Sequence, residues 1–199
     1  MSERQTLPNP LPLLWLLSDA RNDDRLEEAL LALPPNSGFV FRHYHLAHPQ
    51  RRDRFAALAA VATQRRHLVL LAHGDWAQAD AWGADGLYAS PGEALGKQVA
   101  GKILLATAHD ASEIARAEES GADGVFLSPV YPTSSHPDAP TLGPAGFLAL
   151  AQAASVPVIA LGGMTAARAA ALGWPRWGAI DGLVPDTAHS AHHQPPQRA

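Results

Sequence analysis

The 199-residue chain contains no cysteine, which excludes a disulfide framework and a thiolate metal site. Charged residues make up only 17% of it and the formal net charge is −4, so it offers no basic face for nucleic acid. Apolar runs such as residues 11–17 fall far short of the roughly 20 residues that span a membrane. The first residues lack the pattern of a signal peptide, so we expect one soluble, cytoplasmic domain without a membrane partner.

Short apolar segments that end in glycine, serine or threonine are the most informative feature present. They are GADGVFLSPVYPT at 121–133, PVIALGG at 157–163 and GAIDG at 178–182. Continuous apolar and β-branched runs of this length are typical of strands buried on both faces of a parallel sheet. The segments lie within about sixty residues and have helical patterns between them, which indicates βα repeats.

The same alternation extends over most of the chain. The expected strands are 13–18, 38–46, 68–72, 83–88, 103–107, 124–127, 157–161 and 179–183, and the expected helices are 24–33, 52–66, 76–82, 110–120, 144–154 and 165–172. Asp110 or Ser112 could cap the helix at 110–120. Eight strands with connecting helices favour a closed, compact, single-domain (βα)8 TIM barrel over an open doubly wound sheet.

The two ends of the chain do not share this pattern. We expect an N-terminal extension at 1–11, the barrel at 12–185 and a disordered tail at 186–199. The tail leaves the eighth outer helix missing or vestigial. Apolar barrel surface would then be exposed between the helices at 24–33 and 165–172, which predicts a homodimer or a heteromer. His189, His192 and His193 could bind a metal, but a solvated tail is the simpler interpretation.

Binding sites of (βα)8 barrels lie at the carboxyl ends of the strands, and phosphate is often held after strands seven and eight. Gly162, Gly163 and the 181–182 segment with Gly182 occupy those positions. Without a Cβ, the backbone amides of glycine can approach an anion closely. The alternative is that the double glycine only makes a tight turn.

Other side chains expected at this mouth could carry chemistry. His109 follows the fifth strand and could transfer a proton near neutral pH, or could be a partly exposed helix-capping residue. Thr133, Ser135 and His136 lie in a proline-bounded loop that could close over an anionic ligand, or could be an ordinary ordered loop.

Arg42 ends the second expected strand, where a guanidinium would suit a phosphate or carboxylate, and alternation puts Tyr44 on its face. Arg42 on a solvated strand face remains the alternative. His73 and Glu93 follow the third and fourth strands and could reach the same mouth. Neither has a partner at metal-ligand spacing.

At these residues the chain resembles the thiamin-phosphate synthase/TenI superfamily, most specifically in GADGVFLSPVYPTSSH and PVIALGG. The resemblance implies a (βα)8 barrel. It also implies one of two reactions: Mg²⁺-dependent joining of a pyrimidine diphosphate to a thiazole phosphate with loss of pyrophosphate, or aromatisation of a thiazole phosphate tautomer by proton transfer. By the same resemblance, Gly162, Gly163, Thr133 and Ser135 belong to the thiazole phosphate site.

The chain departs from the family pattern where the diphosphate and metal would bind. Tyr44 and His136 replace lysines, and His73-Gly74 replaces an Asn-Asp pair whose aspartate holds Mg²⁺; Glu93 retains the second acidic position. We therefore expect TenI-like tautomerase chemistry on a small phosphorylated heterocycle first, with His109 and His136 catalytic and no cofactor. A synthase that uses Mg²⁺ through Glu93 and His73 is the alternative, and a non-catalytic phosphate-ligand binding protein is the third.

Overall fold

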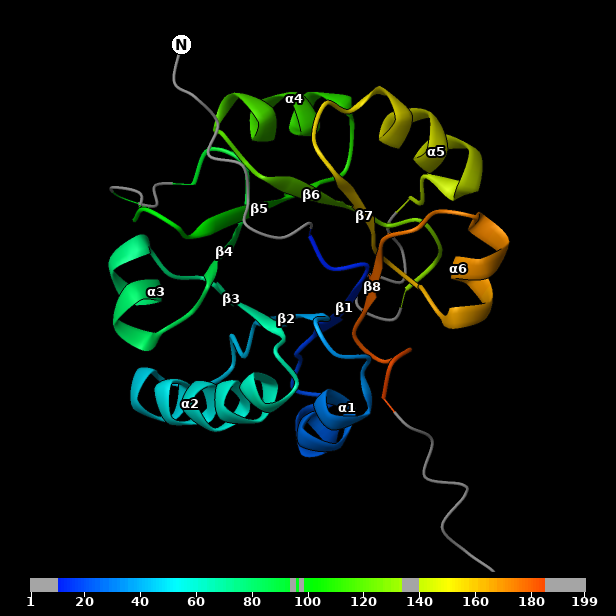
Figure 1. Ribbon diagram of the computed structural model, residues 1–199. Coiled ribbons are helices and arrows are strands. Elements are labelled where there is room, and N and C mark those ends of the chain that lie inside the picture. The colour runs from blue at the N-terminus through cyan, green and yellow to red at the C-terminus, as the bar shows by residue number, and fades with distance from the viewer. Residues whose placement is uncertain (1–10, 94–95, 97–98, 134–139, 185–199) are drawn as a thin grey trace, which may run out of the picture.

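Eight parallel strands close into a barrel in the computed structural model, which describes residues 11–93, 96, 99–133 and 140–184 (Figure 1). Each strand pairs with the next along the chain, and β8 pairs with β1. The strands are β1 (Leu14–Leu17), β2 (Gly38–Phe41), β3 (Leu68–Ala72), β4 (Gly86–Ala89), β5 (Ile103–Ala108), β6 (Gly124–Leu127), β7 (Val158–Ala160) and β8 (Trp177–Ala179). The predicted (βα)8 fold is confirmed.

Helices cover the outside of this barrel. They are the 3₁₀ helix η1 (Asp23–Arg25), α1 (Leu26–Ala32), α2 (His48–Gln64), α3 (Trp76–Trp82), α4 (Ala111–Glu119), α5 (Gly143–Ala153) and α6 (Ala166–Leu172). The Asp110 side chain caps α4 by accepting from the Glu113 N–H. No helix lies in the described parts of the β4–β5 connection or after β8 up to residue 184. The homodimer predicted from the missing eighth helix stays a prediction.

Six predicted strands differ from the structure in their bounds, and β2 and β8 differ most at their carboxyl ends. β2 ends at Phe41 rather than at 46, because the Arg42 N–H donates to the Ser18 hydroxyl and His43 adopts a φ of 29°. β8 is Trp177–Ala179 rather than 179–183, since these residues pair with Leu14–Leu16 of β1. The residues after each strand therefore form the mouth of the barrel instead of extending the sheet.

The core has two layers, as the alternation of side chains across a strand requires. Inward-facing residues such as Trp15, Leu70, Phe126 and Ile159 fill the barrel, and the other buried set packs between the strands and the helices. The Trp15 and Phe126 rings meet edge to face at 5.4 Å. The barrel is thus a packed core below the mouth, and an open site can lie only at its end.

A buried histidine beneath β3 makes the stability of the fold depend on pH. The Nδ1 atom of His67 accepts from the Ser37 N–H at 3.1 Å, so the proton is on Nε2, which donates to the Leu30 carbonyl. Burial lowers the pKa of His67. The folded state therefore binds fewer protons than the unfolded state below about pH 6.5, and stability present above that pH is lost as the pH falls.

We expect the free energy of unfolding to decrease from pH 7.5 to pH 5.5, with at most about 1.4 kcal/mol per pH unit from this one group. Urea unfolding at both pH values measures it. His67→Gln should show a smaller decrease, while the exposed His48→Gln keeps the slope of the unmodified chain. An unchanged slope in His67→Gln would show that other groups carry the effect.

Candidate active site

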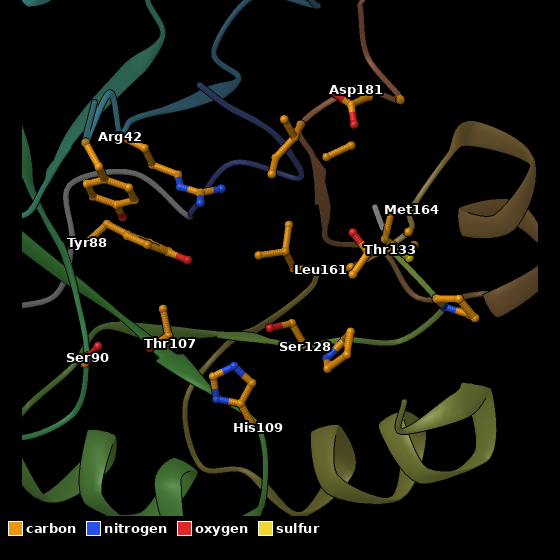
Figure 2. Close-up of a pocket in the computed structure, with 18 of the residues that line it drawn as sticks. Arg42, Tyr88, Ser90, Thr107, His109, Ser128, Thr133, Leu161, Met164 and Asp181 are labelled. Carbon is orange, nitrogen blue, oxygen red and sulfur yellow. The ribbon is translucent and has the colours of Figure 1, made fainter. Parts of the chain in front are cut away.

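A cavity of about 810 Å³ opens at the carboxyl ends of the barrel strands (Figure 2). Its lining comes from the segments that follow all strands except β1, and from the last residues of β4, β5 and β8. The volume lies within the range of small-molecule sites. The cavity brings together residues that are far apart in the sequence, as a barrel mouth does.

The cavity gathers most of the predicted site residues. Those that line it are Arg42, Tyr44, His73, Glu93, His109, Thr133, Gly162, Gly163 and Gly182. Ser135 and His136 lie outside the described residues, and so do the tail histidines. Their predicted roles stay predictions.

The double glycine forms one end of the cavity. Gly162 and Gly163 have φ values of 91° and 62°, which favour glycine, and a Cβ on Gly162 would lie 2.6 Å from the Pro129 Cα. Among the described residues, neither amide N–H donates a hydrogen bond within the chain. The Arg168 Nη1 donates to the Gly163 carbonyl at 2.5 Å and adds a positive charge. This end can therefore hold an anion by backbone donors and one cation.

Arg42 forms the opposite end. Figure 2 shows its guanidinium pointing into the cavity from the side away from Thr133 and Met164. The side chain is 18% exposed, lies over the Tyr44 ring at 5.3 Å and is 3.9 Å from the Asp19 carboxylate. Arg42 and Tyr44 share this wall although they follow β2 in a loop rather than in the predicted strand. A second anionic group could bind here.

Tyr88 projects from β4 into the cavity on the same side as Arg42 (Figure 2). Its ring meets Phe126 edge to face at 5.2 Å. Burial raises the pKa of Tyr88 far above its usual range, so the phenol keeps its proton. The side chain offers a flat apolar ring and a hydrogen-bond donor to a heterocycle.

His109 lies at the rim after β5, with its side chain 58% exposed. The Glu113 Oε2 atom is 2.7 Å from His109 Nδ1 and also accepts the His109 backbone N–H at 2.8 Å. This contact orients the imidazole and leaves Nε2 for a ligand. A carboxylate-oriented histidine is suited to moving a proton.

Sequence reasoning missed two lining residues with useful chemistry, Tyr88 as a ring donor and Arg168 as a cation. The inward alternation of β4 could have placed Tyr88, since Leu87 is part of the outer layer. Arg168 is in the first turn of α6, six residues after Gly162, and its contact with the Gly163 carbonyl is visible only in the fold.

A magnesium ion can be tested against the residues at this mouth. The Glu93 carboxylate lines the cavity on the β4 side and accepts the Ser90 N–H at 3.0 Å. His73, the residue after β3, is a nitrogen ligand and is followed by Gly74. Mg²⁺ is commonly held by one or two carboxylates together with substrate phosphates. The residues therefore fit an ion held by Glu93 and a bound diphosphate, and they do not form an all-protein cage.

The fold and the cavity define a (βα)8 barrel whose binding site, at the carboxyl ends of the strands, has a cationic group at each end. The family model described as thiamine monophosphate synthase matches residues 16–174. The chain belongs to this family, as its resemblance predicted.

Relatives and solved structures agree with this assignment. The chain is 36% identical over 92 residues to a thiamine-phosphate synthase of Chloroflexus aurantiacus, covering 44% of this chain and 43% of that protein. It is 33% identical over 171 residues to the thiamine biosynthesis bifunctional protein ThiM/ThiE of Symbiobacterium thermophilum, covering 82% and 35%. A thiamine phosphate pyrophosphorylase from Pyrococcus furiosus has the same fold, with a TM-score of 0.68, 21% identity and 84% of each chain covered.

The chain spans less than half the length of the curated relatives it matches. Within the described part of the chain, no helix combines the length and apolar character needed to cross a membrane.

Proposed function

We propose that the protein joins a thiazole phosphate to a pyrimidine diphosphate, as a thiamine-phosphate synthase. The observation that carries the proposal is one cavity with suitable groups for an anion at two separate ends: the Gly162-Gly163 amides with Arg168, and Arg42 on the opposite wall. A proton-transfer reaction on one monophosphate needs only the first end. The names of the relatives also favour this reaction, which was the alternative in the sequence analysis, over the tautomerase that was expected first.

Each group in the cavity would have its own role in this reaction. The glycine amides hold the thiazole phosphate, and Tyr88 offers its ring and its phenol donor to a heterocycle from the Arg42 side of the cavity. Arg42 binds the diphosphate and stabilises the charge that accumulates as the bond to this leaving group breaks and the bond to the thiazole forms. A magnesium ion held by Glu93, when bound, supplies further neutralisation of that charge.

The test is incubation of the purified chain with thiazole phosphate and pyrimidine diphosphate, with and without Mg²⁺, followed by assay of thiamin phosphate and pyrophosphate. Formation of both products only with Mg²⁺ supports the proposal. Calorimetric binding of thiazole phosphate without any binding of the diphosphate, at all Mg²⁺ concentrations, would exclude it.

A second candidate is proton transfer on the thiazole phosphate, and the His109–Glu113 pair favours it. His109 lines the cavity with its Nδ1 atom fixed at 2.7 Å from a carboxylate, which is the arrangement of an oriented general base. The homodimer and the third alternative, a non-catalytic binding protein, have no specific support in the described residues.

His109→Ala measures the contribution of this histidine. We expect conversion of the thiazole tautomer to fall about 10²- to 10⁴-fold, the usual contribution of a positioned acid or base. Binding of thiazole phosphate should change by no more than about twofold, since the glycine amides and not His109 would hold the phosphate. The exposed His48→Ala is the matched control. Unchanged tautomer conversion in His109→Ala would assign the proton transfer elsewhere.

A further inference from the structure

Three potential metal ligands meet beside the cavity and have no part in the proposed reaction. They are Asp23 from η1 and the pair His43 and His45 from the loop after β2, and their ligand atoms lie within 4.8 Å of one another. A small hollow of about 180 Å³ opens next to them, lined by His43 and His45 and shared with Arg42 and Tyr44. Among the described residues this is the one cluster of its kind.

We propose that Asp23, His43 and His45 form a binding site for a zinc-like divalent cation, distinct from any magnesium carried by a diphosphate. Two imidazoles and one carboxylate are a donor set that proteins use for zinc with an open fourth position. Imidazole nitrogen selects zinc, nickel or copper over magnesium.

The His43 ring is held in one orientation without a bound metal. It is 1% exposed, and its ring stacks on Phe41 with the centroids 4.5 Å apart. Its Nδ1 atom lies 2.8 Å from the Ser18 hydroxyl, which orients the ring so that Nε2 faces Asp23. Metal-binding histidines commonly have such a partner on the second nitrogen.

The hydrogen bonds of His43 also allow a metal to bind at Nε2. The Nδ1 atom faces the Ser18 hydroxyl, which can either donate or accept a hydrogen bond. On metal binding the Nε2 proton is displaced, and the tautomer with the proton on Nδ1 can donate to Ser18. The hydroxyl oxygen accepts the Arg42 N–H as well, within its capacity of two lone pairs.

Asp23 supplies the anionic ligand. Its Oδ1 atom is 2.8 Å from His43 Nε2 and accepts from Arg54 Nε at 2.7 Å. Arg54 also pairs with Glu27, so two carboxylates face one guanidinium and one negative charge is left over for a cation. The arginine orients the Asp23 carboxylate as a hydrogen-bonded neighbour of a metal ligand does.

His45 completes the set from the solvent side. Its ring is exposed, with its centroid 5.3 Å from that of His43. Ligand atoms about 2.0–2.2 Å from a tetrahedral ion lie about 3.4 Å from one another. His43 Nε2 and Asp23 Oδ1, now 2.8 Å apart, must therefore separate slightly, and the His45 nitrogen must adjust to the same spacing. An exposed side chain can make that adjustment by rotation at small cost. The buried, rigid ligand His43 and the exposed, adjustable ligand His45 thus precede and follow Tyr44 in the sequence.

The direct experiment is calorimetric titration of the chelator-treated full chain with zinc chloride in a phosphate-free buffer. We expect one ion per chain at micromolar or stronger affinity, weakened at least tenfold in His45→Ala. His45 is exposed, so this variant should fold normally, which thermal unfolding verifies. Cobalt(II) added in place of zinc should give a tetrahedral absorption spectrum that His45→Ala loses.

Two control variants locate the ion. His48→Ala removes a nearby exposed histidine outside the cluster, and a triple alanine variant removes His189, His192 and His193. Both should bind zinc as the unmodified chain does. Loss of binding in the triple variant with retention in His45→Ala, or no saturable binding to the unmodified chain, would overturn the proposal. Magnesium chloride at the same concentrations should not compete.

Discussion

Replacement of Arg51 by leucine is expected to lower the free energy of unfolding by about 3 kcal/mol. Arg51 belongs to α2 and is only 6% exposed. Its guanidinium donates to the carbonyls of Ala72, Arg42 and His73, the last two at 3.3 and 3.4 Å. Leucine retains apolar packing but leaves these carbonyls without their donor, and a buried unpaired polar group costs about 1–3 kcal/mol.

Urea unfolding, compared through midpoint and slope, measures this loss. The matched control is Arg52→Leu, the exposed neighbour on the same helix, which should stay within about 0.5 kcal/mol of the unmodified chain. Equal losses in the two variants would mean that the carbonyl contacts of Arg51 do not stabilise the fold. The contacts also fix the backbone of Arg42 and His73, so Arg51→Leu should weaken binding at that wall of the cavity.

Gly163→Ala is expected to weaken binding of thiazole phosphate at least about tenfold, a free-energy loss of about 1.4 kcal/mol or more. Gly163 has a φ of 62°, and an added Cβ would overlap the Pro132 carbonyl oxygen and lie 3.0 Å from that of Tyr131. The new methyl group must therefore displace the segment that carries Thr133 or the glycine amides themselves. Either movement removes donors from the phosphate.

Isothermal titration calorimetry with thiazole phosphate measures this loss of affinity. Gly83→Ala is a close control, because Gly83 has a φ of 75° and its added Cβ would meet nothing within 4 Å. Gly83→Ala should introduce the same kind of backbone strain and lower the free energy of unfolding by about 1 kcal/mol. Its affinity for thiazole phosphate should not change. If Gly163→Ala binds as tightly as the unmodified chain, the double glycine is a turn and not an anion site.

The fold could be predicted from the sequence where a strand or helix has local boundaries. β3, β6 and α3 match their predicted ranges, because apolar runs and small residues mark both ends. β2 and β8 do not, since their ends depend on partners distant in sequence: the Ser18 hydroxyl stops β2, and pairing with β1 sets the register of β8. Local patterns contain no information about either contact.

In the candidate site, too, some residues could be placed from local patterns and others only from contacts between distant segments. Gly162, Gly163 and His109 were predictable because a barrel places the residues after its strands at one mouth. Arg51 was not, since it lies just before the predicted helix at 52–66 and a lone arginine is usually solvated. The meeting of Asp23 with His43 was not predictable either, because it depends on how the loops after β1 and β2 turn toward each other.

The pairing of β8 with β1 has a consequence for how the chain folds. Residues 177–179 complete the barrel by joining strands separated by more than 160 positions, and the Asn22 amide reaches the Ile180 carbonyl across the same seam. A growing chain on the ribosome cannot close this seam until β8 emerges, so β1 presents an open sheet edge for most of synthesis. Such late closure by non-local contacts slows folding.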